Sequence, residues 1–178
     1  MKNWETDKAG LPSESDPGVV SNDNPDRARI IAPPPLIPLI CILLGFAVKH
    51  FVSPLPLFAT KTNFQVSAGA ALVAFAVVIV ASCRRAFIER GTHPNPYTPT
   101  KAIVTNGMYG LSRNPIYVAF LLIVLSFVLF ANSLWFIGSA ILTFLLLQFG
   151  VVKREEEYLH EKFGAEYDEY CQRVRRWV

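Results

Sequence analysis

The chain has 178 residues, of which 52% are hydrophobic and 17% are charged, and its formal net charge is +3. This length suits one domain. The long apolar runs leave no soluble basic face, so a nucleic-acid partner is not expected, and the scattered three cysteines and three histidines predict neither a metal site nor a disulfide framework.

The first 32 residues differ in composition from the rest of the chain. They carry four basic and six acidic side chains, are rich in Ser, Asn, Asp and Pro, and contain no apolar stretch of the kind found in signal peptides. Such a segment cannot bury enough surface to fold. We therefore predict a disordered polar tail over 1–32 and one membrane domain over 33–178.

Four apolar stretches in the membrane domain are typical of transmembrane helices, which need about 20 apolar residues each. The fold class predicted is an all-α integral membrane protein. The second stretch is rich in small residues, which let helices approach closely in lipid. Three residues separate the third and fourth stretches, which predicts a tight antiparallel hairpin. The predicted spans are 35–52, 66–83, 115–130 and 134–152.

The basic residues predict how these spans are oriented. Arginine or lysine residues precede the first span, fill the connection between the second and third, and follow the fourth. The positive-inside rule then places both termini and the 84–114 connection in the cytosol. We predict a multi-pass membrane protein with a cytosolic active site, in contact with membrane lipid.

The connection 84–114 is long enough to be functional. Its beginning is expected to continue the second helix to about Arg90, with Gly91 as a stop signal. At its end, Asn114 suits a helix N-cap and Pro115 the first helical position. This pair is either a helix start alone or, with Arg113 beside it, an anion-binding helix start.

The segment 153–178 is predicted to be an amphipathic cytosolic helix pair that breaks at Gly164. Glu155 lies on its apolar stripe, where the fourth span ends, and an acid in that position needs a partner or a function. Glu157 and Glu161 are expected to face water. For Glu156 two interpretations stay open, a solvent-facing side chain or a functional one, and the solvent-facing interpretation is favoured at least equally. The stripe consists of Leu159, Phe163, Tyr167, Tyr170 and Val174, in which the tyrosines are expected to pack.

Residues 84–178 contain three motifs in order: Val104-Thr-x-Gly107-x-Tyr109, Arg113-Asn114-Pro115-x-Tyr117 and Glu155-Glu156-x-x-Leu159-x-x-x-Phe163-Gly164-x-x-Tyr167-x-x-Tyr170. Together they resemble the isoprenylcysteine carboxyl methyltransferase family, and phospholipid methyltransferases are similar in the same region. The resemblance is to compact prokaryotic members. It implies a helical membrane enzyme that binds S-adenosylmethionine in a cytosol-facing pocket and methylates a lipophilic acceptor from the bilayer.

The resemblance also implies site residues. Arg113 and Glu155 are the expected catalytic residues. Asn114 stands where many members have His, and it cannot titrate near neutral pH. Val151 stands where eukaryotic members have a substrate-binding Arg, which leaves the substrate less defined than the cofactor. The expected cofactor-binding residues are Lys101, Val104, Tyr109, Asn114, Pro115, Ile116, Tyr117 and Glu155.

The expected reaction is an in-line methyl transfer, which depends chiefly on positioning. Glu155 is expected to bind ribose hydroxyls or the ammonium of the cofactor, and Arg113 its carboxylate. The acceptor is a prenylcysteine carboxylate, an amino lipid or a small lipophilic acid. Two alternatives are an NADPH-dependent membrane reductase of the sterol-reductase type and a non-catalytic membrane scaffold. No glycine-rich dinucleotide-binding motif follows a strand, which argues against a soluble Rossmann methyltransferase.

Overall fold

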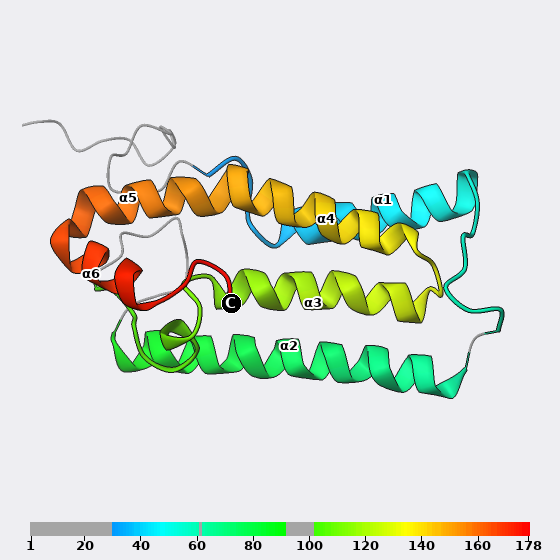
Figure 1. Ribbon diagram of the computed structural model, residues 1–178, viewed down its shortest axis with the longest axis horizontal. Helices are drawn as coiled ribbons and strands as arrows, with labels where there is room; N and C mark the ends of the chain where they lie inside the picture. Colours follow the sequence, from blue (N-terminus) through cyan, green and yellow to red (C-terminus); the bar gives the residue numbers. More distant parts are fainter. Residues whose placement is uncertain (1–29, 61, 92–101) are drawn as a thin grey trace, which may run out of the picture.

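A computed structural model describes residues 30–60, 62–91 and 102–178, and all the regular secondary structure in this part of the chain is helical (Figure 1). The predicted all-α class is therefore confirmed. The predicted tail over 1–32 lies almost wholly outside the described residues. The helices are α1 (Leu36–Phe51), α2 (Asn63–Glu89), a 3₁₀ turn (Gly107–Gly110), α3 (Pro115–Phe130), α4 (Trp135–Leu147), a π-helical turn (Gln148–Val152), α5 (Lys153–Phe163) and α6 (Ala165–Arg173).

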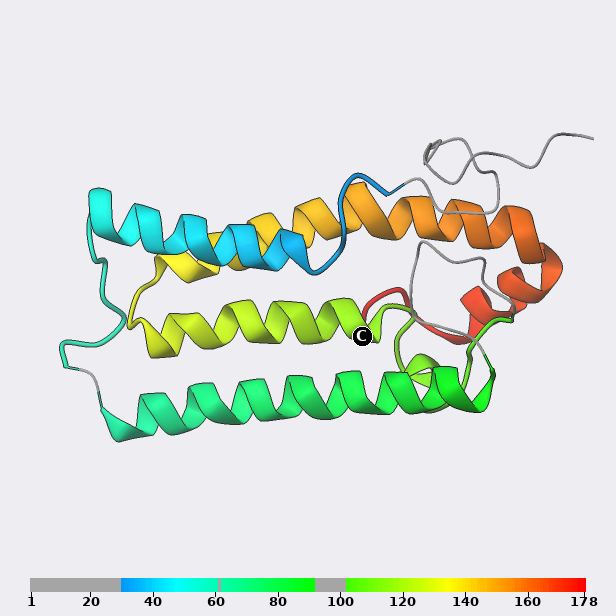
Figure 2. The ribbon, with the colours of Figure 1, turned by 180° about the vertical axis from the view of Figure 1, so that it is seen from behind.

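Four helices form the bundle. In Figures 1 and 2, α2, α3 and α4 run side by side, and α1 packs along α4 on one face. The predicted helix bounds hold closely: α3 begins at Pro115 and ends at Phe130, and α2 continues to Glu89, before Gly91 with a φ of +61°. The four-residue turn between α3 and α4 makes the predicted hairpin.

The helices differ in length. By length and hydropathy, α2 and the continuous helix Trp135–Phe163 could each cross a membrane, whereas α1 and α3 are shorter apolar helices of 16 residues. At 1.5 Å per residue, 16 residues span roughly 24 Å, and 29 residues span roughly 43 Å. The hydrocarbon core of a bilayer is about 30 Å thick, so the long helix exceeds that thickness.

The outer faces of the bundle are apolar. Leu39 and Leu43 on α1 and Phe75 and Val78 on α2 each expose more than half of their surface. Contiguous apolar surface on this scale marks contact with a partner or with lipid. Together with the length of α2, it fits a bundle whose outside faces a bilayer.

Two glycines set the distance between neighbouring helices. A Cβ at Gly69 on α2 would lie 2.8 Å from the ring of Phe130, and a Cβ at Gly45 on α1 would lie 2.7 Å from Ser139 Oγ and 2.9 Å from Phe136. The small residues predicted to allow close helix approach therefore do so at Gly69.

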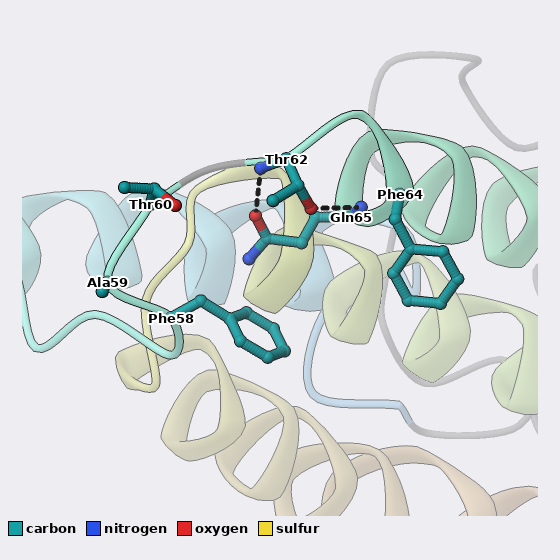
Figure 3. A pocket seen from close by; sticks show the side chains of 6 residues that line it. All are labelled: Phe58, Ala59, Thr60, Thr62, Phe64 and Gln65. Carbon is teal, nitrogen blue, oxygen red and sulfur yellow. Dashed lines mark hydrogen bonds between the residues drawn. The ribbon is translucent and has the colours of Figure 1, made fainter.

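The end of the bundle that holds the α3–α4 turn is closed mostly by hydrogen bonds of neutral side chains, joined by one from Lys49 Nζ to Ala131 O. Thr62 caps α2: its backbone N–H donates to Gln65 Oε1 at 2.7 Å, and its hydroxyl accepts from the backbone N–H of Gln65 (Figure 3). Gln65 is 2% exposed and donates to Asn132 Oδ1 at 3.1 Å. Asn132 has a φ of +47° and also bonds the backbone of Phe58.

An apolar pocket of about 360 Å³ opens beside this capping box (Figure 3). It lies at the opposite end of the bundle from every predicted site residue that the structure describes. Its lining is Phe58, Ala59, Thr60, Thr62, Phe64 and Gln65.

At the other end, the long helix changes its pitch and then leaves the bundle. A π-helical turn over Gln148–Val152 joins α4 to α5, and Gly150 O accepts a hydrogen bond from the N–H of Ile31. Such turns often occur at functional sites. Gly164, with a φ of +51°, ends α5 and lets α6 fold back, as predicted. Tyr167, Tyr170 and Val174 are buried with Ile103, which confirms the apolar stripe.

Candidate functional site

The predicted site residues that the structure describes gather at one end of the bundle. There α2 ends, α3 begins and α5 leaves the other helices, while α6 and the C-terminal segment fold back toward the start of α3 (Figures 1 and 2). We call this the site end, and the end with the α3–α4 turn the closed end. Lys101, a predicted cofactor residue, lies outside the described residues.

Glu155 and Tyr117 form the centre of the site end. The Tyr117 hydroxyl, from the first turn of α3, donates to Glu155 Oε1 at 2.8 Å. Tyr117 is 8% exposed, and Glu155 is partly buried. Glu155 lies beyond the apolar stretch that ends at Val152, and within the described residues no ion pair involves it.

The surroundings of Glu155 favour its neutral form. Burial raises the pKa of Glu155 to about 7, the hydrogen bond from Tyr117 lowers it, and the neighbouring Glu156 raises it. A carboxyl group of this kind is stabilised in its charged form by a cation or by additional hydrogen-bond donors. Glu155 is therefore suited to bind a positively charged group or hydroxyl groups.

Tyr109 is held against the ends of α2 and α6. Its ring packs edge-on against Phe87 with 5.4 Å between ring centroids, and its backbone carbonyl accepts from the Tyr170 hydroxyl at 2.7 Å. Val104, 6% exposed, lies just before it in the chain. These contacts fix the 102–110 segment against the C-terminal helices, so two of the three motifs meet in space.

The start of α3 differs from the predicted cap. Asn114 is the N-cap residue, but its side chain does not cap α3; its Nδ2 donates instead to the backbone carbonyl of Arg176 at 2.9 Å. Pro115 is fully buried at the first helical position, and Ile116 packs between the two main apolar clusters. The helix start is thus pinned by the C-terminal segment.

Arg113 and Glu156 form an ion pair, so the interpretation of Glu156 as solvated is wrong. Arg113 Nη1 lies 3.2 Å from Glu156 Oε1, and the two side chains are only 14% and 15% exposed. Arg176 binds the same carboxylate from the other side, at 2.9 Å and 2.8 Å. The prediction considered α5 alone, and on an isolated helix Glu156 would face water. In the folded chain two arginines cover it, one from the start of α3 and one from the C-terminal segment. Glu157 and Glu161 are exposed, as predicted.

Residues 174–177 form a strap that the sequence did not reveal. The backbone N–H of Arg113 donates to Arg175 O at 2.9 Å, and the indole N–H of Trp177 donates to Gln148 Oε1 at 2.8 Å. Trp177 also packs on Phe144, with 5.0 Å between ring centroids. The strap thereby joins the start of α3 to the π-helical turn. Residues 174–177 have no helical or strand periodicity, so the one signal for such a segment in the sequence is its aromatic and basic composition.

One donor at the site end has no partner. Arg113 Nε is buried and makes no hydrogen bond in the described part of the chain, while Nη1 contacts Glu156 and Cys171 Sγ. A buried unpaired donor is costly, and its occurrence calls for a reason. No group of three His, Cys, Asp or Glu side chains suited to a metal ion occurs among the described residues.

Comparison with known proteins identifies the class. The family model of phospholipid methyltransferase matches residues 64–166, which is more than half of the chain. The chain therefore belongs to the phospholipid methyltransferase family. Membership implies an integral membrane protein and S-adenosylmethionine-dependent methylation of a lipid-type acceptor.

One relative and the structural comparison add little about function. An uncharacterized protein of Haemophilus influenzae (strain ATCC 51907 / DSM 11121 / KW20 / Rd) is 46% identical over 63 residues, covering 35% of this chain and 98% of the relative. No solved structure matches the chain. The family, and not a characterised relative, therefore carries the functional argument.

Proposed function

We propose that the site end binds S-adenosylmethionine and that the chain transfers its methyl group to a lipophilic acceptor from the bilayer. The observation that carries this proposal is the meeting of the three motifs at the site end: Tyr117 of the second motif donates to Glu155 of the third, and the carbonyl of Tyr109 in the first accepts from Tyr170 of the third. When bound, the cofactor supplies a methyl group on a positively charged sulfur.

The residues present fit such a cofactor. Glu155, which has no ion-pair partner among the described residues, would bind the ammonium group or the ribose hydroxyls. Arg113 would receive the carboxylate; at the start of α3, Pro115 has no N–H, and the N–H groups of Tyr117 and Val118 are bonded to Asn114 O. Tyr109, Tyr117, Val104 and Ile116 would supply the apolar walls. Asn114 and Pro115 would act through the backbone, by setting where α3 begins.

The chain's part in the reaction is positioning. Methyl transfer needs the acceptor atom, methyl carbon and sulfur in line, and holding two reactants in this geometry can contribute several kcal/mol to the barrier reduction, about 7–11 in favourable cases. Glu155 stands where the long helix leaves its apolar stretch. A site at this level would hold the polar cofactor beside an acceptor that remains dissolved in lipid.

The proposal also concerns which acceptor receives the methyl group. The resemblance to isoprenylcysteine carboxyl methyltransferases favours a prenylcysteine carboxylate. However, Val151 is fully buried in the core against α1, Arg176 is bound to Glu156, and Arg113 is assigned to the cofactor's carboxylate. An amino lipid is therefore a second candidate. Its ammonium must lose a proton before it attacks, and Glu155, with a pKa of about 7, can accept that proton if it binds the cofactor through the ribose hydroxyls and not through the ammonium.

The arrangement in the membrane follows from the same proposal. We propose four transmembrane helices, with α1 and α3 completed by their flanking residues, and with the site end and both termini in the cytosol. Cysteine labelling from each side of sealed vesicles tests it: a cysteine at exposed Glu157 should react from the cytosolic side and one at exposed Thr60 from the opposite side. The reverse pattern would reject the orientation.

The activity is tested by methyl transfer in proteoliposomes. Radiolabelled S-adenosylmethionine would be supplied with an extract of bacterial lipids, with pure phosphatidylethanolamine, or with a prenylcysteine analogue. We expect label in at least one acceptor for the wild type and for Glu157→Gln, and a loss of most label for Glu155→Gln. Label in phosphatidylethanolamine but not in the prenylcysteine analogue would support the amino-lipid acceptor. No label in any acceptor, together with no cofactor binding, would reject the proposed function.

A further inference from the structure

Glu156 is the residue through which three segments of the site end meet. It lies on α5, one position after Glu155, and its carboxylate binds Arg113 at the start of α3 and Arg176 in the strap. Its side chain is 15% exposed, so the pair is not a solvated surface contact, of the kind that contributes little.

The contacts of Glu156 are divided between its two oxygens. Arg176 holds both of them: Nε donates to Oε1 at 2.9 Å and Nη2 lies 2.8 Å from Oε2. This two-point geometry fixes the plane of the carboxylate. Oε1 is then directed to Arg113 Nη1 at 3.2 Å. Arg176 therefore orients Glu156, and Glu156 orients Arg113.

Arg113 needs such a partner because the contact that fixes its backbone does not fix its guanidinium. The strap fixes the backbone, through the hydrogen bond from Arg113 N–H to Arg175 O. The guanidinium could still take other rotamers; it is held by Glu156 and by Cys171 Sγ on α6. The buried Nε, which has no partner in the described part of the chain, is placed by the same two contacts.

We propose that Glu156 is a positioning residue for the cofactor: held by Arg176, it fixes the guanidinium of Arg113 in the orientation that receives the cofactor's carboxylate. This inference rests on the proposed function and deepens it. It assigns a role to the second glutamate of the Glu155-Glu156 pair and to the strap. Glu156 itself does not touch the reacting atoms.

Steady-state kinetics and binding separate positioning from a structural role. Glu156→Gln keeps the shape of the side chain and removes its charge; Glu157→Gln is the matched control on the exposed face. We expect Glu156→Gln to raise the Kd and KM for S-adenosylmethionine by about tenfold, the lower end of the loss seen when a residue that orients a metal ligand is removed. The KM for the acceptor should stay unchanged, and Glu156→Asp should recover part of the affinity.

A double variant tests whether Glu156 acts through Arg113. If it does, Arg113→Gln with Glu156→Gln should bind S-adenosylmethionine no more weakly than Arg113→Gln alone. Fully additive losses would overturn the inference. So would a Glu156→Gln protein that melts at a lower temperature but binds the cofactor with wild-type affinity.

Two further results keep the inference distinct from the proposed function. If the wild type fails to bind S-adenosylmethionine, the proposed function falls. If the wild type binds and Glu155→Gln does not, while Glu156→Gln binds normally, only the inference falls. Should Glu156→Gln not fold, Arg176→Gln takes its place: Arg176 is 41% exposed, and its loss should raise the cofactor Kd by a smaller factor without unfolding the protein.

Discussion

The two ends of the bundle solve the same problem in opposite ways. At both, helices end and backbone groups need hydrogen-bond partners. The closed end uses mostly neutral side chains, with Gln65, Asn132 and Ser133 bonding neighbouring loops; Ser133 Oγ donates to Pro54 O at 2.7 Å, and the charge there is that of Lys49, which donates to Ala131 O. The site end uses charged and titratable ones, and keeps one carboxyl group, Glu155, without an ion-pair partner among the described residues.

This difference indicates where function lies. Neutral hydrogen bonds stabilise a turn without cost from unpaired charge, which is what a purely structural loop needs. Burying the carboxyl of Glu155 with only a tyrosine partner lowers stability, and such a cost is typical of binding and catalytic sites. Variants at the site end should therefore change ligand affinity, and variants at the closed end should change stability alone.

The largest effect is expected for Arg113→Gln. This change removes the proposed partner of the cofactor's carboxylate and one of the two arginines at Glu156, and the loss of a buried charged hydrogen bond weakens binding on the order of 30-fold or more. Titration of S-adenosylmethionine into purified protein measures it. Arg173→Gln, at an exposed surface ion pair with Glu169, is the control and should bind normally.

At the closed end, Gly69→Ala should reduce stability and leave cofactor affinity unchanged. The new Cβ would lie 2.8 Å from the Phe130 ring, which forces α2 and α3 apart at a cost of about 1–3 kcal/mol. Thermal unfolding in lipid nanodiscs provides the measurement. Gly138→Ala, where a Cβ meets nothing within 4 Å, should be neutral or stabilising. Equal destabilisation by both would contradict the packing described for α2 and α3.

Gln65→Ala should have a similar but smaller effect. It removes the hydrogen bonds to the exposed Thr62 and the half-buried Asn132, at a cost of about 1 kcal/mol. The exposed Gln172→Ala is the matched control in the same unfolding assay. A change in S-adenosylmethionine affinity for folded Gln65→Ala would contradict the claim that closed-end variants change stability alone.

Cofactor affinity should depend on pH through Glu155. Because its pKa is about 7 in the folded protein, the carboxyl is charged above that pH and neutral below it. A positively charged ligand prefers the charged form, so affinity should fall as the pH drops from about 8 to 6. Titrations across this range with the wild type and Glu155→Gln test it; the variant should show a flatter profile. A wild-type profile as flat as the variant's would remove Glu155 from the cofactor site.

Tyr117→Phe should shift the midpoint of this pH profile, which is a smaller effect than the loss of Glu155. The hydroxyl of Tyr117 donates to Glu155 and lowers its pKa, so its loss should move the midpoint of the affinity profile to higher pH. At pH 7 the variant should bind S-adenosylmethionine a few-fold more weakly, because more of Glu155 is neutral. A midpoint that moves to lower pH would contradict the contact.

Local patterns in the sequence were enough to predict the helices, because apolar runs, Asn114-Pro115, Gly91 and Gly164 each act on their own segment. The position of Glu155 followed from the same periodicity. The partners of Asn114 and Glu156 could not be predicted in this way. The partner of Asn114 and one of the two arginines at Glu156 lie in the strap, more than 60 residues from Asn114 and 20 residues from Glu156, and the strap has no helical period to place it.

The most direct test of the account is a titration of S-adenosylmethionine and, separately, NADPH into wild type, Glu155→Gln and Glu157→Gln in detergent. The account predicts that wild type and Glu157→Gln bind S-adenosylmethionine alike, that Glu155→Gln binds it at least about tenfold more weakly, and that none binds NADPH. Well-folded wild-type protein that binds NADPH but not S-adenosylmethionine, or a Glu155→Gln protein with wild-type affinity, would contradict it.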